Sequence, residues 1–277
     1  MSPDAPPAVI SLCSTARLTH LRNQLGALAG GSGVIRVVVW LGDDEPPALD
    51  AEVVVRVAPG PDGLRLAAAR NAGARAARAA GARLLIFLDA DCVPGPRLLD
   101  RYREASTRHP SAVLCGPVTY LPPGIDAVAP ASLVPLTSPH PARPAPADGE
   151  ERVGTMTEYA LFWSLSFAVT GAVWDRAGGF DEAYEGYGGE DTDFAFRLRA
   201  AGVPLVWVGG AHAYHQYHET SSPPWQHLDD ILRNGELFAR RWGEWPMLGW
   251  LRAFEEAGAV VARDGGWRRA ASPAAAD

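Results

Sequence analysis

The sequence is poor in cysteine, and its three cysteines, Cys13, Cys92 and Cys115, are widely scattered. Their spacing is not that of a metal-binding motif, and so few cysteines argue against a disulfide framework. A reducing compartment is the simpler interpretation, so we expect a cytoplasmic protein.

Long hydrophobic runs are also missing. The longest, such as 84–88, are far too short to span a bilayer. Residues 1–7 show no basic region followed by an apolar stretch, as a signal peptide would. We therefore expect no transmembrane segment and no leader.

An excess of basic charge is absent as well. Asp and Glu number 32 against 25 Lys and Arg, which gives a formal net charge of -7 and a pI near 5.5. This balance argues against a nucleic-acid partner, because such proteins usually carry a basic patch. An acidic protein that handles an anionic nucleotide needs a metal ion or a few placed arginines.

What is present is the composition of a globular α/β protein of 277 residues, with 47% hydrophobic residues. In the first half, strand patterns alternate with helix patterns. This order predicts a mainly parallel central sheet flanked by helices, with ligands bound beyond the carboxyl ends of the strands. The expected strands are 8–13, 34–41, 52–57 and 83–88, and the expected helices are 18–28 and 64–80.

Residues 121–151 are rich in proline and have neither a helical nor a strand period. We interpret them as a long loop over the site that is mobile without ligand and ordered over bound donor or acceptor. Helices are expected at 190–201 and 225–242, with a strand at 203–208 between them. The predicted organisation is a disordered tail 1–7, one α/β domain 8–218, a C-terminal helical extension 219–262 and a disordered tail 263–277.

Two carboxylates, Asp89 and Asp91, follow the buried strand 84–88 directly. A hard cation such as Mg²⁺ or Mn²⁺ prefers oxygen ligands of this kind and can bridge them to a diphosphate. Turn chemistry alone would also place Asp after a strand, so this triplet is a weak signal taken by itself.

A glycine-rich approach leads into the acidic sequence Glu190-Asp191-Thr192-Asp193 at the start of a helix. Carboxylates in a first helical turn are favoured by the helix dipole, which accounts for all three without any function. Glycines also let a backbone pass close to a ligand. A carboxylate presented there could take a proton from a sugar hydroxyl.

Three histidines, His212, His215 and His218, lie three residues apart after an apolar strand. So dense a group favours at least one metal ligand. Three residues of extended chain span about 10 Å, so a single site holding all three is disfavoured. Whether His212 or His218 joins or replaces His215 stays open.

In this order, the segments resemble glycosyltransferase family 2 and its relatives with a GT-A fold. The resemblance runs from about residue 8 to 218, and the part from 189 to 216 is similar to chondroitin-polymerase-type and galactosyltransferase-type enzymes. Each motif is modest, and their order and spacing carry the likeness. The matching segments are Ala69-Arg70-Asn71-Ala72-Gly73, Phe87-Leu88-Asp89-Ala90-Asp91, Gly178-Gly179-Phe180-Asp181-Glu182, Gly189-Glu190-Asp191 and Ala213-Tyr214-His215-Gln216.

The resemblance implies roles for individual residues. Asp91, with Asp89 beside it and His215 from the second half, would hold Mn²⁺ or Mg²⁺ against the donor diphosphate. Asp191 would be the catalytic base, with Glu190 orienting the acceptor. The remaining implied contacts are Ser14, Asp43, Asp44, Arg70 and Asp89 for the donor, and Tyr187, Gly189 and Glu190 for the acceptor.

The family often has a Pro-Thr-Tyr-Asn-like turn after its first strand, where this chain reads Cys13-Ser14-Thr15-Ala16. That departure leaves the nucleotide open, with a UDP-sugar favoured. The resemblance implies a metal-dependent, inverting enzyme that moves a hexosyl or N-acetylhexosaminyl group to a hydroxyl of a small-molecule or glycan acceptor. A metal ion stabilises the departing diphosphate, and one carboxylate base suits one displacement.

Two other functions compete with this one. A nucleotidyltransferase also places paired carboxylates near a metal, but it usually has a glycine-rich, basic phosphate loop that is missing after Cys13. A binding module without catalysis is disfavoured by the presence of every expected acidic residue and of His215. The sugar, the acceptor and the oligomeric state are left open.

Overall fold

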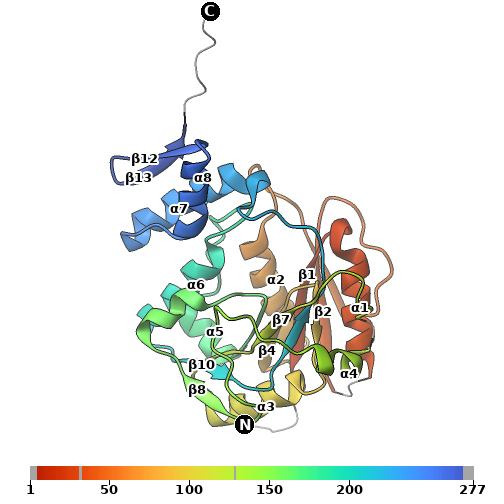
Figure 1. Cartoon of the computed structure of the whole chain (residues 1–277). Helices are drawn as coiled ribbons and strands as arrows, with labels where there is room; N and C mark the ends of the chain where they lie inside the picture. Colours follow the sequence, from red (N-terminus) through yellow and green to blue (C-terminus); the bar gives the residue numbers. More distant parts are fainter. Residues whose placement is uncertain (1–4, 31–32, 128, 271–277) are drawn as a thin grey trace, which may run out of the picture.

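The computed structural model describes residues 5–30, 33–127 and 129–270 (Figure 1). Its centre is an eight-stranded sheet with the order β3-β2-β1-β4-β9-β6-β10-β8. Strands β3, β2, β1 and β4 are parallel to one another, as are β6 and β10. The α/β prediction is confirmed. The strands are β1 (Ala8–Cys13), β2 (Ile35–Leu41), β3 (Val53–Val57), β4 (Leu84–Leu88), β6 (Val113–Cys115), β8 (Glu151–Val153), β9 (Ser166–Thr170) and β10 (Leu205–Val208).

Two strands depart from the parallel arrangement. Strand β9 runs antiparallel to both of its neighbours, β4 and β6, and β8 is an antiparallel edge strand next to β10. The hydrophobic pattern of β9 does not reveal this, because a strand buried on both faces reads as an apolar run in either direction.

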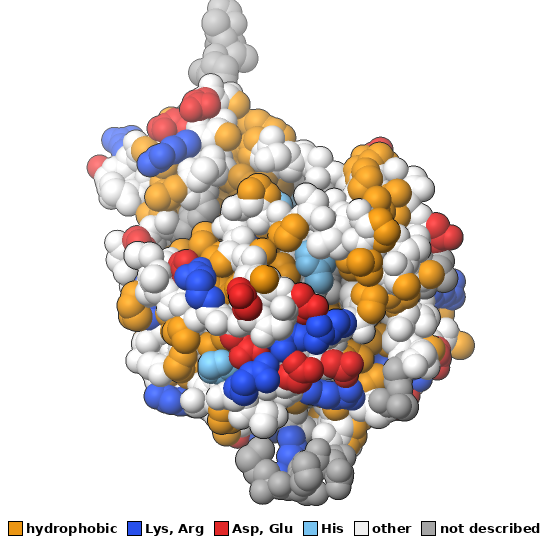
Figure 2. All heavy atoms as spheres, turned by 60° about the horizontal axis from the view of Figure 1, so that its bottom comes forward, with side chains coloured by type: hydrophobic (Ala, Val, Ile, Leu, Met, Phe, Trp, Pro, Cys, Tyr) orange, Lys and Arg blue, Asp and Glu red, His pale blue; other side chains and the backbone are white. Residues whose placement is uncertain are grey.

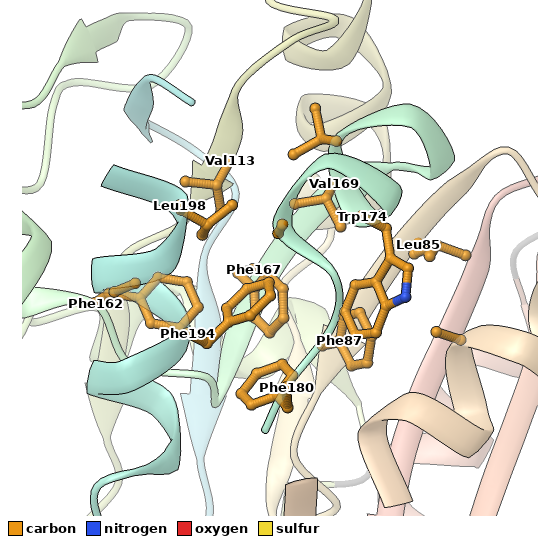
Figure 3. Packing of buried hydrophobic residues seen from close by; sticks show 14 of the residues in the cluster. Leu85, Phe87, Val113, Phe162, Phe167, Val169, Trp174, Phe180, Phe194 and Leu198 are labelled. Carbon is orange, nitrogen blue, oxygen red and sulfur yellow. The ribbon is translucent and has the colours of Figure 1, made fainter. Parts of the chain in front are cut away.

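Helices cover both faces of the sheet because successive strand residues point to opposite sides. Ile10 and Phe87 pack with one helical layer, whereas Val9 and Ile86 pack with the other. Figure 3 shows the first layer, where the rings of Phe87 and Phe167 stack. The first layer contains α2 (Leu66–Ala79), α5 (Gly171–Ala177) and α6 (Glu190–Ala200), and the second contains α1 (Leu18–Ala29) and α3 (Leu98–Arg108).

Helix α2 lies unusually close to the sheet, which explains its alanine-rich sequence. A Cβ on Gly73 would stand 2.5 Å from Ile10 Cγ2 and 3.0 Å from Val39 Cγ2. Close packing at this point requires a residue without a side chain. The end of β4 and the residue Arg70 on α2 are thereby held next to each other.

A second, three-stranded sheet lies at the carboxyl edge of the parallel strands. It consists of β5 (Cys92–Pro94), β11 (Ala213–His215) and β7 (Val118–Tyr120), in the order β5-β11-β7. Strand β5 begins immediately after Asp91, and β11 ends at His215.

The proline-rich loop 121–151 is partly structured and packs against this small sheet. It contains α4 (Pro130–Leu133) and the 3-10 turn η2 (Val134–Leu136). Its residues Leu121, Ala127 and Leu133 form a buried cluster with Val93 and Tyr214. The prediction that the loop has no internal structure was therefore wrong for residues 130–136. The spacing of the prolines gives no sign of these short helical turns, which tertiary contacts stabilise.

An ion-pair network ties α3 to the edge strand β8. Arg101 and Arg108 both pair with Glu151, and Arg101 also pairs with Glu104. On the face shown in Figure 2, basic and acidic side chains lie side by side. Charged side chains of this kind protect an exposed edge strand from pairing with another chain.

The C-terminal extension is helical, as expected, and ends in a β-hairpin. The tail was expected to be disordered from residue 263, but Gly266–Arg269 pairs with Val260–Arg263 and Trp267 packs on the extension's apolar cluster. Residues 271–277 and 1–4 lie outside the described residues, and the Pro7 carbonyl accepts a hydrogen bond from Ile35. The elements are η4 (Trp225–His227), α7 (Leu228–Trp242), α8 (Leu248–Glu256), β12 (Val260–Arg263) and β13 (Gly266–Arg269).

In the parts of the chain that the structure describes, no helix combines the length and the apolar character needed to cross a membrane.

Candidate functional site

The candidate donor residues from the first strands gather where these strands end. Ser14 directly follows β1, and Asp44 lies three residues beyond β2. Asp44 accepts hydrogen bonds from Thr15 Oγ1 at 3.2 Å and from Trp40 Nε1 at 3.2 Å. Asp43 lies beside it and is exposed. The two acidic residues therefore line one rim of the site, next to the turn that follows β1.

Asp91, His215 and His218 form a cluster that could hold a metal ion. One ligand atom from each lies within 4.8 Å of the others. Asp91 Oδ1 is 3.6 Å from His215 Nε2, and Asp91 Oδ2 is 3.3 Å from His218 Nε2. The pairing of β5 with β11 sets Cys92 opposite His215, so Asp91 comes beside the imidazole.

The other two histidines are separated by the fold. The chain leaves β11 at His215 and bends, so His218 returns to Asp91 and the extended-chain distance does not apply to it. His212 is buried elsewhere, with Nε2 2.7 Å from Thr119 Oγ1. His218 thus lies with His215 beside Asp91, whereas His212 lies elsewhere.

The protonation of this cluster suits a cation ligand set. Burial alone would raise the pKa of Asp91, but the hydrogen bond from His218 and the charges of His215, His218 and Arg17 outweigh it and lower that pKa. Burial also lowers the pKa of His215, with Asp91 opposing it. Near neutral pH the cluster therefore presents an ionised carboxylate and a neutral imidazole at His215.

Arg17 adds a positive charge that sequence reasoning missed. It lies in the short turn η1 (Thr15–Arg17), with Nε 3.5 Å from Asp91 Oδ2 and Nη2 3.1 Å from His218 Nδ1. The only available signal was its position just after the first strand. Arg17 is half-buried beside the cluster.

Asp89 and Glu190 are linked through Arg70. The buried guanidinium of Arg70 donates to Glu190 Oε1 at 3.1 Å and lies 3.7 Å from Asp89 Oδ1. One arginine therefore joins the end of β4 to the start of α6. Partial burial raises the pKa of Asp89 to about 6 against the opposing charge of Arg70.

The acidic turn is shaped by glycines. Gly188 and Gly189 have φ values of 89° and 91°, in the left-handed region that other residues rarely adopt. A Cβ on Gly189 would also stand 3.2 Å from the ring of Tyr184. This backbone turns Glu190 and Asp191 toward the carboxyl edge of the sheet at the start of α6.

Among the described residues, Asp191 is the carboxylate of this turn that has no ion pair or hydrogen bond with a basic side chain. Its Oδ1 accepts only from the neighbouring Thr192, from N at 2.7 Å and from Oγ1 at 3.3 Å. Burial and then the charge of Glu190 raise the pKa of Asp191 to about 7, against the opposing charge of Arg70. A carboxyl group with a pKa near neutrality is suited to exchange a proton with a substrate.

Asp193, by contrast, is a structural residue. It is fully buried, and Oδ1 accepts from Arg241 at 2.7 Å and from Trp242 Nε1 at 2.9 Å. The helix dipole alone therefore does not account for Asp193, because α7 packs over it and supplies these donors.

Tyr187 connects the site to the C-terminal extension. Its ring stacks on His227 with centroids 4.4 Å apart, and its N–H donates to Asp230. Trp250 lies at 5.8 Å in a tilted arrangement. The extension therefore forms one wall beside the acidic turn.

Two family models match the sequence. Residues 44–169 match the glycosyl transferase family 2, and residues 147–219 match the family described as N-terminal domain of galactosyltransferase. The two matches overlap, and together they include the residues of the metal cluster and the acidic turn.

Curated relatives cover part of the chain. Validoxylamine A glucosyltransferase of Streptomyces hygroscopicus subsp. jinggangensis is 29% identical over 208 residues, which are 65% of this chain and 45% of that protein. Chondroitin synthase of Escherichia coli is 29% identical over 175 residues, which are 56% of this chain and 25% of that protein. The chain thus spans less than half the length of these relatives.

Solved structures share the fold at low sequence identity. GalNAc-T7, crystallised with UDP, GalNAc and Mn²⁺, has a TM-score of 0.59 at 14% identity and covers 87% of this chain and 49% of its own. TarS of S. aureus has a TM-score of 0.57 at 14% identity, and the match covers 91% of this chain and 42% of the TarS chain. The architecture is therefore the GT-A fold. In sequence, residues 44–169 are similar to glycosyltransferase family 2.

Proposed function

We propose that the chain is a metal-dependent, inverting glycosyltransferase. It moves a hexosyl or N-acetylhexosaminyl group from a nucleoside-diphosphate sugar, with UDP as the favoured nucleotide, to a hydroxyl of a small-molecule or glycan acceptor. The observation that carries the proposal is the convergence of the cluster Asp91, His215 and His218 with Asp191 at one edge of the sheet. Arg70 links the neighbours of these two groups, because it pairs with Asp89 on one side and Glu190 on the other.

The donor set of the cluster fits Mn²⁺ better than Mg²⁺. Two imidazoles and one carboxylate are a mixed nitrogen and oxygen set, whereas Mg²⁺ favours oxygen ligands in octahedral geometry. A bound ion would polarise the donor phosphates and stabilise the charge of the leaving diphosphate. Asp89 would support the site from the end of β4.

Asp191 is the base in this proposal. It accepts the proton of the acceptor hydroxyl as the oxygen attacks the anomeric carbon on the face opposite the leaving group. Arg17, next to Asp91, donates to the diphosphate as it departs and stabilises its growing charge. Glu190, held by Arg70, orients the acceptor together with Tyr187 and the backbone of Gly189.

The nucleoside lies at the other rim of the site. Asp43 and Asp44 accept from its hydroxyl or base N–H groups, and Ser14 contributes from the turn after β1. Arg70 faces the donor from α2. These contacts extend the expectation from the sequence, and they are supported by the common position of the residues at the carboxyl edge.

The test is release of nucleoside diphosphate from a panel of nucleotide sugars, with Mn²⁺, with Mg²⁺ and after metal removal. Asp91→Ala and His215→Ala should lose most transfer while the far-ultraviolet circular dichroism spectrum is kept. Full activity of either variant in metal-depleted buffer would contradict the proposed metal site. Release of pyrophosphate from nucleoside triphosphates would instead identify a nucleotidyltransferase.

A further inference from the structure

Arg143, in the proline-rich loop, is a buried guanidinium that lacks hydrogen-bond partners. Its residue exposure is 5%, and none of its three side-chain nitrogens has an acceptor within the described residues. A buried polar group without a partner is costly, and a buried charge more so. Such a group in a native structure calls for an explanation, and a bound ion or polar ligand is one.

Two tryptophans enclose the guanidinium. Its Cζ lies 5.0 Å from the ring centroid of Trp163 and 5.1 Å from that of Trp207. Cation–π contacts of this kind engage the faces of the guanidinium and leave the N–H groups at its edge unused. Those N–H groups form the planar fork that binds carboxylate or phosphate with two parallel hydrogen bonds.

A continuous series of rings leads from the metal cluster to this arginine. Tyr120 stacks on His215 at 4.4 Å, His140 lies 5.4 Å from Tyr120, and Trp163 lies 5.0 Å from His140. Tyr120 is 48% exposed, so the series presents an open aromatic surface beside the cluster. Aromatic surfaces of this kind suit the apolar face of a sugar ring.

Arg143 also interacts electrostatically with groups of the site. Burial lowers the pKa of Arg143, while the ionised forms of Cys115, Tyr102, Tyr120 and Asp191 oppose that shift. Its field therefore acts on the carboxylate proposed as the base and on the tyrosine that covers His215.

We propose that Arg143 is an anion-binding residue for the nucleotide-sugar donor, meeting a carboxylate on the transferred sugar or the donor diphosphate. This inference rests on the proposed function, because it assumes that the donor binds at the cluster. In this arrangement the sugar, bonded through its anomeric carbon to the diphosphate, would lie along the ring series that ends at Arg143.

The experiment measures donor binding and stability in Arg143→Met and Arg143→Lys. Binding of UDP, UDP-glucose and UDP-glucuronate in the presence of Mn²⁺ is measured by calorimetry, and the melting temperature is measured without ligand. Arg240→Met is the matched control, since Arg240 is exposed and pairs with Glu236 along α7. We expect Arg143→Met to weaken binding about tenfold to a hundredfold, the scale of a lost charge-assisted hydrogen bond.

The three ligands separate the two sources of the anion. A loss confined to UDP-glucuronate assigns Arg143 to a sugar carboxylate, and an equal loss for all three assigns it to the diphosphate. The lysine variant keeps the charge but not the fork, so its affinity should fall between the wild type and Arg143→Met.

Stability separates a binding role from a packing role. Because Arg143→Met removes a buried unpaired charge, the melting temperature of the unligated variant should equal or exceed that of the wild type. A clear fall in melting temperature with unchanged affinity in both variants would overturn the inference while leaving the glycosyltransferase intact. A wild type that binds no nucleotide would overturn both.

Discussion

Asp191 and Asp193 stand two residues apart in one helical turn, and their surroundings give them different chemistry. Asp193 faces α7, and its Oδ1 accepts from Arg241 and Trp242. Asp191 faces the site and, within the described part of the chain, accepts hydrogen bonds only from Thr192, next to the like charge of Glu190. A helix places such neighbours on different faces, so adjacent carboxylates serve different purposes.

Asp191→Asn should leave donor and metal binding nearly unchanged while transfer falls about a hundredfold or more, the usual scale for a lost general base. A base acts only when it is deprotonated, so the acid limb of kcat/KM should lie near the pKa of about 7 and vanish in the variant. Steady-state rates across pH test this. Near wild-type turnover, or collapse of donor binding, would point to Glu190 instead.

The same raised pKa has a consequence for stability. The folded state holds the Asp191 proton more tightly than the unfolded chain, whose carboxyl has the ordinary value of 3.8. The stabilisation of the folded state by this bound proton is therefore lost as pH rises toward 7. Asp191→Asn should melt at a higher temperature than the wild type at pH 8, and the difference should shrink toward pH 4.

Asp193→Asn should chiefly lower stability. The change removes the ionised acceptor of Arg241 and Trp242 inside the protein, which costs about 1–3 kcal/mol. Denaturant unfolding measures this cost. The control is Asp229→Asn, because Asp229 pairs with Arg269 at the surface, where a pair is worth below about 1 kcal/mol. Equal losses in the two variants would contradict a structural role for Asp193.

His218 and His212 make a matched pair for the metal site. His218→Ala should weaken Mn²⁺ binding by at least about tenfold, because the loss of a residue that only contacts a metal ligand already lowers metal affinity by about that factor. His212→Gln should leave it unchanged, because His212 contacts Thr119 rather than Asp91. Titration of Mn²⁺ followed by electron paramagnetic resonance distinguishes them, and identical affinities would exclude His218 as a ligand.

At the scale of elements, the pairing of β5 with β11 is what assembles the site. The N–H of Gln216 donates to the carbonyl of Asp91 at 2.7 Å, and Cys92 lies opposite His215. This contact joins the first half of the chain to the second. Without it, the residues after β4 and those after β10 would have no fixed relation.

The proline-rich loop should be the first site of proteolysis. Residues 134–139 are exposed, while Leu133 and Arg143 on either side are buried, so cleavage should fall between these anchors. Mn²⁺ with UDP-sugar should slow the cut if the loop closes over the donor. The measurement is the rate of nicking by a nonspecific protease, and equal rates with and without saturating ligand would argue against a lid.

At the scale of the whole molecule, ligand binding and stability are coupled. A ligand at about 100 times its Kd stabilises the folded state by about 2.7 kcal/mol, which for a chain of this size corresponds to about 5–10 °C in Tm. UDP with Mn²⁺ should give such a shift, and a chelator should abolish it. The shift should also be missing in Asp91→Ala, and a shift that survives there would place the metal elsewhere.

The sequence by itself determined the α/β architecture, the first four sheet strands and the carboxylates after β4. These features follow from local patterns, since apolar runs and helical periodicity act over a few residues. The glycines before Glu190 likewise marked the acidic turn, because left-handed backbone restricts the choice of residue.

Only the tertiary structure decided which of those residues meet. It brought His218 rather than His212 to Asp91, placed Arg17 beside them, and buried Asp193 under α7 and Arg143 between two tryptophans. The direction of β9 was decided in the same way. Each of these outcomes depends on contacts between segments far apart in the chain, and a local pattern carries no information about which distant segment will pack against it.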